Sequence, residues 1–130
     1  MAQPLTLDLL KGEWSIAHLP AAEPVPDWAY SEVFSSVSRT SDELSIIAPS
    51  QQVPSSVKSE GGFRVLAVRG PLAFDAKGIL ADLAGAIADA DVSLLALSTF
   101  DTDILLVRQQ DLAAAAAALE SRSHHVVQIT

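Results

Sequence analysis

The chain has 130 residues, a formal net charge of −8 and no cysteine, so disulfides, thiol nucleophiles and thiolate metal sites are excluded. An acidic surface repels nucleic-acid phosphates, and the first residues lack the basic and apolar regions of a signal peptide. No uncharged apolar stretch reaches the roughly 20 residues that a membrane span needs. We therefore expect a cytoplasmic protein that binds neither nucleic acid nor membrane.

The first sixty residues contain four short runs that predict strands. Leu5–Leu10 and Trp14–Leu19 alternate apolar and polar side chains around a Lys-Gly-Glu turn, which predicts a β-hairpin. Val33–Ser38 and Leu44–Ile47 flank a polar turn and predict a second hairpin. Residues 49–62 are rich in Pro, Ser and Gly and are expected to form a connector.

The second half predicts longer elements. The apolar run Phe63–Arg69 predicts a strand that breaks at Gly70-Pro71. Ala76–Ala90 has apolar residues at the spacing of one helix face, and Asp75 is the expected N-cap. Gly78 then falls inside the first turn, where glycine costs roughly 1 kcal/mol relative to alanine. This cost indicates a close approach to the backbone at that position.

Three further elements complete a βαββαβ order within about seventy residues. Residues 97–107 read as two apolar strands joined by a tight acidic turn, Gln110–Arg122 as an alanine-rich helix, and Val126–Ile129 as a last strand. This order is the split βαβ, ferredoxin-like arrangement of an α+β protein. The RNA-recognition domain shares the order, but the predicted central strands lack its stacking aromatic residues. RNA binding is therefore excluded.

Two motifs carry a family resemblance. Gly-Pro-Leu-x-Phe-Asp-x-x-Gly-Ile-Leu, from Gly70 to Leu80, and Leu-Ser-Thr-Phe-Asp-Thr-Asp-Ile-Leu-Leu-Val, from Leu97 to Val107, resemble the ACT domain family of amino-acid-sensing regulatory modules. The resemblance extends to small stand-alone bacterial proteins with two ACT-like halves and to the repeats of the eukaryotic cytosolic arginine sensor. It covers roughly residues 61–129 closely and the first half loosely.

A weak internal repeat supports two ACT-like halves. A shift of 60 residues places Ser38–Ile47 on Ser98–Val107, with apolar, turn and acidic positions in register. We therefore expect tandem ferredoxin-like units, a degenerate ACT-like half over residues 1–60 and an ACT domain over residues 61–130. In the first half, Trp14–Leu19 and a short turn are expected to replace the first long helix.

The resemblance implies five ligand-binding residues: Gly78 and Ile79 as backbone contacts at a helix start, and Thr99, Phe100 and Asp103 in the acidic turn. A helix start favours a carboxylate, and the Asp103 carboxylate is expected to accept the ligand's ammonium group. Ala76 stands where the arginine sensor has an acidic residue, which argues against arginine. The alternatives remain open: Ile79 as an ordinary core residue, and Asp103 as a solvated turn former.

Other residues give weaker signals. His124 and His125 are adjacent and lack the spacing of a metal pair, and His18 stands alone. Trp14 and Trp28 are expected to be core residues. The sequence shows no nucleophile–base pair and no glycine-rich phosphate loop. We therefore expect no catalytic activity, no metal and no cofactor.

The expected function is therefore that of a non-enzymatic regulatory module. It binds a free amino acid, or a similar small zwitterion, at an ACT-domain interface, and it forms a homo-oligomer, most simply a dimer. The alternative is a structural or protein-interaction module of the same fold that binds no ligand.

Overall fold

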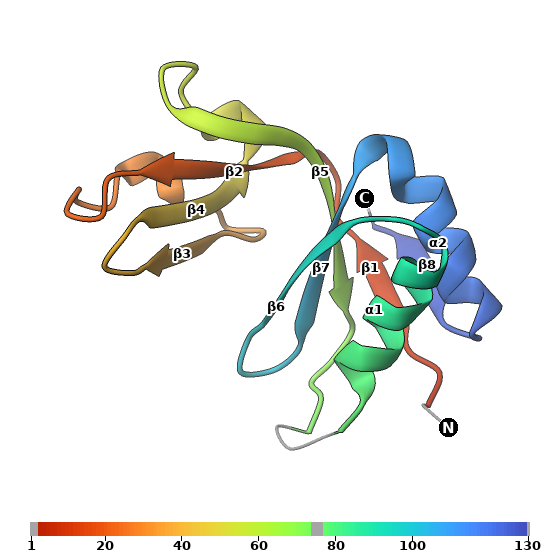
Figure 1. The fold of residues 1–130 in the computed structure, drawn as a ribbon. Helices are drawn as coiled ribbons and strands as arrows, with labels where there is room; N and C mark the ends of the chain where they lie inside the picture. The colour runs from red at the N-terminus through yellow and green to blue at the C-terminus, as the bar shows by residue number, and fades with distance from the viewer. Residues whose placement is uncertain (1–2, 74–76, 130) are drawn as a thin grey trace. The chain divides into compact units, whose positions relative to one another are not determined.

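The computed structural model describes residues 3–73 and 77–129, which form two compact units (Figure 1). Residues 12–63 make up the small unit, whereas Met1–Lys11 and Arg64–Thr130 make up the large unit. The chain passes from the small to the large unit within one long strand, β5 (Lys58–Val68). The expected boundary is at residue 60, between two consecutive halves. In the structure, the first eleven residues belong to the large unit together with the second half of the chain.

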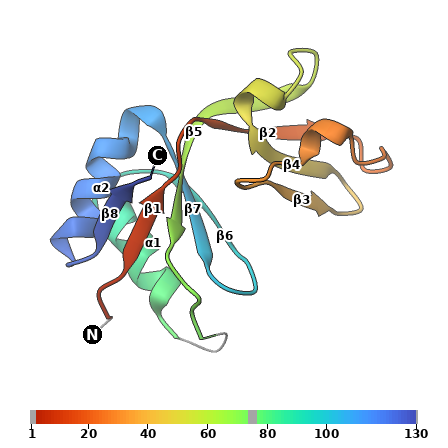
Figure 2. The same ribbon diagram turned by 180° about the vertical axis from the view of Figure 1, so that it is seen from behind.

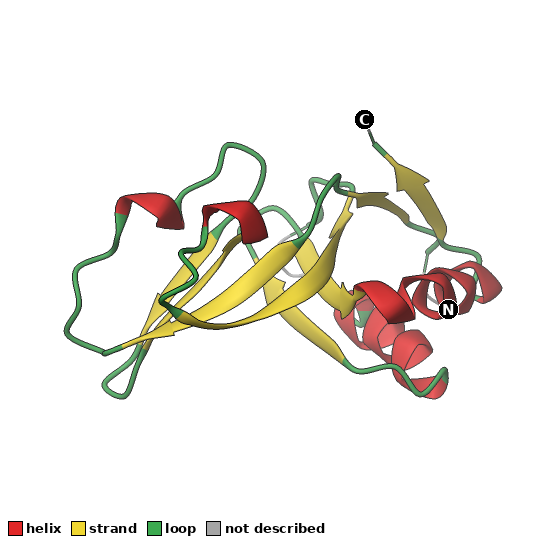
Figure 3. Cartoon of the chain, turned by 90° about the horizontal axis from the view of Figure 1, so that it is seen from above, coloured by secondary structure: helices red, strands yellow, loops and turns green. Residues whose placement is uncertain are grey.

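The small unit is an antiparallel sheet with two short 3-10 helices (Figure 3). Its other elements are β2 (Trp14–Leu19), η1 (Asp27–Ala29), β3 (Ser36–Arg39), β4 (Leu44–Pro49) and η2 (Ser50–Gln52). The strands lie in the order β3-β4-β2-β5. Alternation along β4 points Leu44, Ile46 and Ala48 to one face, where they pack with Ala17 and Ala29 as a buried cluster.

The large unit carries the predicted βαββαβ order. After β5 come α1 (Ile79–Asp89), β6 (Leu94–Ser98), β7 (Asp103–Arg108), η3 (Gln109–Asp111), α2 (Leu112–Ser121) and β8 (His125–Gln128). β7 pairs with β5 and, antiparallel, with β6. The βαββαβ prediction for this half is therefore confirmed, and the fold class is α+β and ferredoxin-like.

The first strand, β1 (Thr6–Leu9), lies between β5 and β8 in the large unit (Figure 2). It is antiparallel to β5 and parallel to β8. The predicted hairpin between residues 5–10 and 14–19 is therefore wrong. The physical reason is burial, since Leu7 and Leu9 reach the large hydrophobic core from this position.

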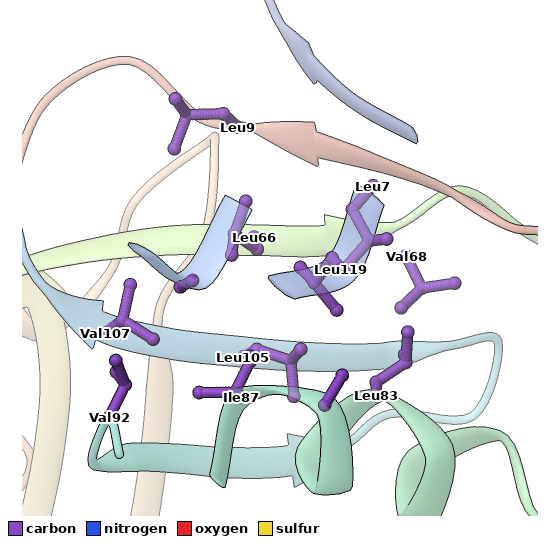
Figure 4. Packing of buried hydrophobic residues seen from close by; sticks show 12 residues of the cluster. Leu7, Leu9, Leu66, Val68, Leu83, Ile87, Val92, Leu105, Val107 and Leu119 are labelled. Carbon is purple, nitrogen blue, oxygen red and sulfur yellow. The ribbon is translucent and has the colours of Figure 1, made fainter. Parts of the chain in front are cut away.

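The core of the large unit lies between the sheet and its two helices (Figure 4). α1 contributes Leu83 and Ile87, and α2 contributes Leu119, at the helical spacing seen in the sequence. These side chains pack against β1, β5 and β7, which supply Leu7, Leu9, Leu66, Val68, Leu105 and Val107. The small alanine side chains of α2 let this helix lie close to its neighbours, and Ala115 is fully buried.

Two predicted boundaries differ from the structure. Residues 58–62, expected in a connector, form the first part of β5, because pairing with β2 stabilises a segment whose own strand propensity is low. α1 begins at Ile79 rather than at residue 76, with Gly78 as its N-cap in a left-handed conformation. A positive φ interrupts a right-handed helix, so Gly78 cannot lie inside the first turn. The predicted N-cap, Asp75, lies outside the described residues.

Candidate functional site

A solvent-open cavity of about 310 Å³ lies in the large unit, between the start of α1 and the turn that joins β6 to β7. Its lining residues are Leu72, Ala73, Gly78, Ile79, Leu80, Ala81, Ser98, Thr99, Phe100, Asp101, Thr102 and Asp103. All five residues predicted from the sequence are among them. The structure therefore brings together two motifs that are about twenty residues apart in the chain.

The helix start forms one wall of this cavity. Gly78 has a φ of 79°, and a Cβ placed on it would meet no atom within 4 Å. Glycine is therefore favoured by backbone conformation, and its missing side chain leaves open space beside the helix end. The first N–H groups of an α-helix lack partners within the helix, and no described side chain caps α1. This wall therefore carries the partial positive charge of a helix N-terminus.

Ile79 and Leu80 have a second role. Both side chains are half-buried and pack against the hydrophobic core of the large unit. The alternative raised from the sequence, that Ile79 is a packing residue, therefore holds for its side chain. Only the backbone of Ile79 remains available for contact with an anion at the helix start.

The β6–β7 turn forms the opposite wall and is tied to itself. The Thr99 N–H donates to the Thr102 carbonyl at 2.8 Å, and the Thr102 N–H donates to the Thr99 hydroxyl at 3.1 Å. Because both bonds close the same four-residue turn, its shape is fixed locally. Phe100 lies at the tip of the turn with 79 % of its surface exposed.

The turn is also tied to the chain after β5. The Thr102 hydroxyl donates to the Val68 carbonyl at 2.5 Å, and the Leu72 N–H donates to the Asp101 carbonyl at 2.7 Å. Asp101 therefore acts through its backbone, while its side chain is exposed. These two bonds hold the turn beside the segment that leads into α1.

Asp103 is the half-buried carboxylate of the cavity. It begins β7 directly opposite Ser98 on β6, and the Ser98 hydroxyl donates to its Oδ1 at 2.6 Å. This bond orients the carboxylate at the end of the turn. Ser98 was missed from the sequence, although pairing across a tight turn places positions 98 and 103 opposite each other.

The weaker candidates lie elsewhere. Trp14 is buried and donates its indole N–H to the Phe34 carbonyl at 2.9 Å, and Trp28 packs against the small core, so both are structural. His18 is exposed, whereas His124 is fully buried in the large unit. Within the described residues, no three His, Asp or Glu side chains are grouped as metal ligands. In the same residues, no helix is long and apolar enough to cross a membrane.

Comparisons with known proteins identify two family models and a close structural relative. The family model for the ACT domain matches residues 58–121, and a second model, described as an N-terminal domain, matches residues 12–56. Protein Atu0741 from Agobacterium tumefaciens is 35 % identical, with a TM-score of 0.93 over 99 % of this chain and 96 % of its own. No protein with a curated description matches significantly.

More distant structures share the fold. Protein VC0802 from Vibrio cholerae, described as a possible transport protein, is 16 % identical with a TM-score of 0.74 over 92 % of this chain and 90 % of its own. The regulatory subunit of aspartate kinase from Thermus thermophilus is 10 % identical with a TM-score of 0.60, over 93 % of this chain and 98 % of its own.

Residues 58–121 of the chain belong to the ACT domain family. With its two units it resembles the Atu0741 protein along nearly its whole length. Its fold is also that of aspartate kinase regulatory domains. The family assignment supports a ligand-binding regulatory module, a class that typically lacks catalysis.

Proposed function

We propose that the protein is a regulatory module that binds a free amino acid in the cavity between α1 and the β6–β7 turn. One observation carries the proposal: the N-terminal end of α1 and the Asp103 carboxylate line the same cavity. A helix start favours a carboxylate, and an aspartate favours an ammonium group. These are the two charged groups of a zwitterionic amino acid.

The cavity walls also limit the ligand's side chain. The lining side chains of Leu72, Ile79 and Leu80 are apolar, and the charged ones among the described residues are Asp101 and Asp103. None of the described lining residues is basic, so an acidic ligand side chain has no cationic partner there. We therefore propose that neutral amino acids bind more tightly than aspartate or glutamate.

We further propose that the site is completed by a second copy of the chain. Among the described strands, β6 pairs only with β7, so its other edge is unpaired. β6 carries no charged residue, and Leu95 is 38 % exposed. An uncharged strand edge favours pairing with another chain, and Ser98, at the end of β6, lines the cavity. Light scattering at tens of micromolar is expected to give a dimer mass, and a monomer mass would contradict this arrangement.

The first test is a thermal-shift screen of the wild-type protein with each of the twenty amino acids. Free ligand at 100 times its dissociation constant stabilises a protein by roughly 2.7 kcal/mol, which corresponds to a rise in Tm of several degrees for a domain of this size. If no amino acid at millimolar concentration changes Tm, the protein is a structural or protein-interaction module without a ligand.

The second test uses the amino acid with the largest shift. Asp103→Asn removes the charge but keeps an oxygen that can accept from Ser98, so the fold is preserved. A hydrogen bond to a charged group contributes roughly 1.5–3 kcal/mol, so titration calorimetry should show affinity falling about ten- to a hundredfold. The matched control Asp101→Asn should change affinity little, because only its backbone is used. Equal effects of both variants would contradict the assignment of Asp103.

A further inference from the structure

One buried ionisable side chain of the large unit has no part in the cavity. His124, in the turn between α2 and β8, is 1 % exposed. Its Nδ1 lies 3.1 Å from the Leu5 amide nitrogen, just before β1, and its Nε2 lies 2.7 Å from Asp82 Oδ2 on α1. The imidazole therefore bridges the inserted first strand and the first helix.

These two contacts fix the tautomer of the ring. A backbone N–H can only donate, so Nδ1 must be the acceptor for Leu5. A neutral imidazole has one donor and one acceptor nitrogen, which places the proton on Nε2. His124 then donates to the Asp82 carboxylate, and both ring nitrogens are satisfied only in this neutral form.

The charged groups around the ring come from α1 and from the end of α2. Arg122 Nη1 lies 3.0 Å from Asp82 Oδ1, and Arg122 Nη2 lies 2.7 Å from Asp89 Oδ2. The hydrogen bond from His124, and secondarily that from Arg122, hold the pKa of Asp82 below its ordinary value, although burial opposes them. Arg122 already balances the charge of Asp82. The side of the ring towards β1 presents the Leu5 N–H.

We propose that His124 is a protonation-sensitive latch that joins Leu5, just before β1, to α1 in its neutral form and releases the Leu5 amide when it is protonated. A proton on Nδ1 places two N–H groups opposite each other at 3.1 Å, so the bond from Leu5 breaks. The bond from Nε2 to Asp82 is kept, because imidazolium also donates there. Protonation therefore frees the Leu5 amide, while β1 stays paired with β5 and β8 and the ring stays bonded to α1.

Asp82, the helix partner of His124, lies one helical turn from the residue at the cavity wall. The Asp82 N–H donates to the Gly78 carbonyl at 2.9 Å, and Gly78 lines the cavity. A change at His124 is thus joined by two hydrogen bonds to the start of α1. The latch depends on the contacts of His124 alone and does not require the proposed ligand.

The test uses nitrogen-15 NMR of the wild-type protein. At neutral pH the imidazole shifts should report a proton on Nε2. As the ring is protonated, the exchange protection of the Leu5 amide, corrected for intrinsic rates, should fall roughly tenfold for the loss of one hydrogen bond. The reference is the Arg69 amide, which donates to Thr6 on the same strand at 2.8 Å and should change little. A proton on Nδ1 at neutral pH, or equal changes at Leu5 and Arg69, would overturn the proposal.

Two variants separate the two bonds of the latch. His124→Asn keeps an acceptor near the position of Nδ1 but is too short to reach Asp82, whereas His124→Gln keeps the reach towards Asp82. Both should abolish the response of the Leu5 amide to lowered pH. The control His125→Asn, at an exposed position of β8, should keep it. A response retained in both His124 variants contradicts the latch. If neither variant folds, the wild-type measurement still decides.

Discussion

In the large unit, α1 and α2 cover one face of the sheet, whereas the small unit has only η1 and η2, each of three residues. The strand order is nevertheless the same. The order β5-β2-β4-β3 in the small unit corresponds to β8-β5-β7-β6 in the large unit, where β1 is inserted between β8 and β5. This strand topology therefore forms with or without the two long helices.

The two units also differ at the corner that holds the cavity. In the large unit the turn before β7 is tied to the chain after β5 by the Leu72 N–H and the Asp101 carbonyl. At the same place in the small unit, the Arg39 guanidinium donates to the Ala21 carbonyl after β2. The strand pairs Arg39–Leu44 and Ser98–Asp103 close equivalent turns, so Leu44 stands where the large unit has Asp103, and the acidic Glu43 corresponds to Thr102. The small unit therefore lacks both the long helix start and the carboxylate that line the cavity of the large unit.

The largest expected effect concerns the helix cover of the large unit. Leu83 on α1 is fully buried, so Leu83→Ala leaves a cavity and should lower the free energy of unfolding by about 2–5 kcal/mol. Urea denaturation measures this loss. The control Leu80→Ala, at a half-buried position, should cost clearly less. An equal loss of unfolding free energy in both variants would mean that Leu83 is not packed more tightly than Leu80.

A second prediction concerns the joint between β5 and the β6–β7 turn. A Cβ on Gly70 would lie 3.0 Å from the Leu72 nitrogen and 3.1 Å from the Asp101 oxygen, both backbone atoms that cannot easily move. Gly70→Ala should therefore cost about 1–3 kcal/mol and separate the two walls of the cavity. Thermal unfolding measures the cost. Gly78→Ala is the control, because its Cβ meets no atom and only the positive φ opposes it. A larger loss of stability in Gly78→Ala than in Gly70→Ala would contradict the tight backbone packing inferred around Gly70.

The third prediction concerns pH. Because the pKa of Asp82 is lowered in the folded protein, its ionised form stabilises the fold at a pH above the ordinary aspartate value of about 4. This contribution is lost as the pH falls below about 4 and through the folded pKa. Asp82→Asn should lower stability by about 1 kcal/mol at pH 7, and the difference from wild type should shrink below pH 4. Denaturation at several pH values checks it, and a constant difference would contradict the ion pairing.

The smallest expected effect is at Gly85, in the middle of α1. A Cβ there would lie 3.5 Å from Arg122 Nη1, an ordinary contact with a flexible side chain. Gly85→Ala should therefore raise stability by roughly 0.5–1 kcal/mol through helix propensity. The small unit has no comparable helix to improve. A destabilised variant in thermal unfolding would show that Arg122 cannot move aside.

The elements of the large unit could be predicted because their signals are local. The spacing of Leu83 and Ile87 predicts the buried face of α1, and it is confirmed. The position of β1 could not be predicted, because nothing in residues 6–9 distinguishes pairing with a neighbouring strand from pairing with strands sixty and more residues away. Burial of Leu7 and Leu9 decides that choice, and burial depends on the whole fold.

The candidate site was partly predictable for a related reason. Gly78 and Asp103 belong to motifs that the family resemblance identifies, and the fold brings those motifs to one cavity. The sequence pattern places Gly78 inside the first turn of the helix, whereas the structure places it at the N-cap with a positive φ, which sequence spacing does not reveal. The orientation of Asp103 by Ser98 needed the strand register. The contacts of His124 could not be predicted, because Leu5, Asp82 and His124 come from three segments that meet only in the folded chain.

The most direct test of the comparison is the stoichiometry of ligand binding. Titration calorimetry with the amino acid that gives the largest thermal shift should yield one ligand per chain, because only the large unit joins a helix start to an oriented carboxylate. The companion titrations of Asp103→Asn and of Glu43→Gln should show weakened binding in the first and unchanged binding in the second. Two ligands per chain, or a loss of binding in the Glu43 variant, would contradict the claim that the small unit has lost the site.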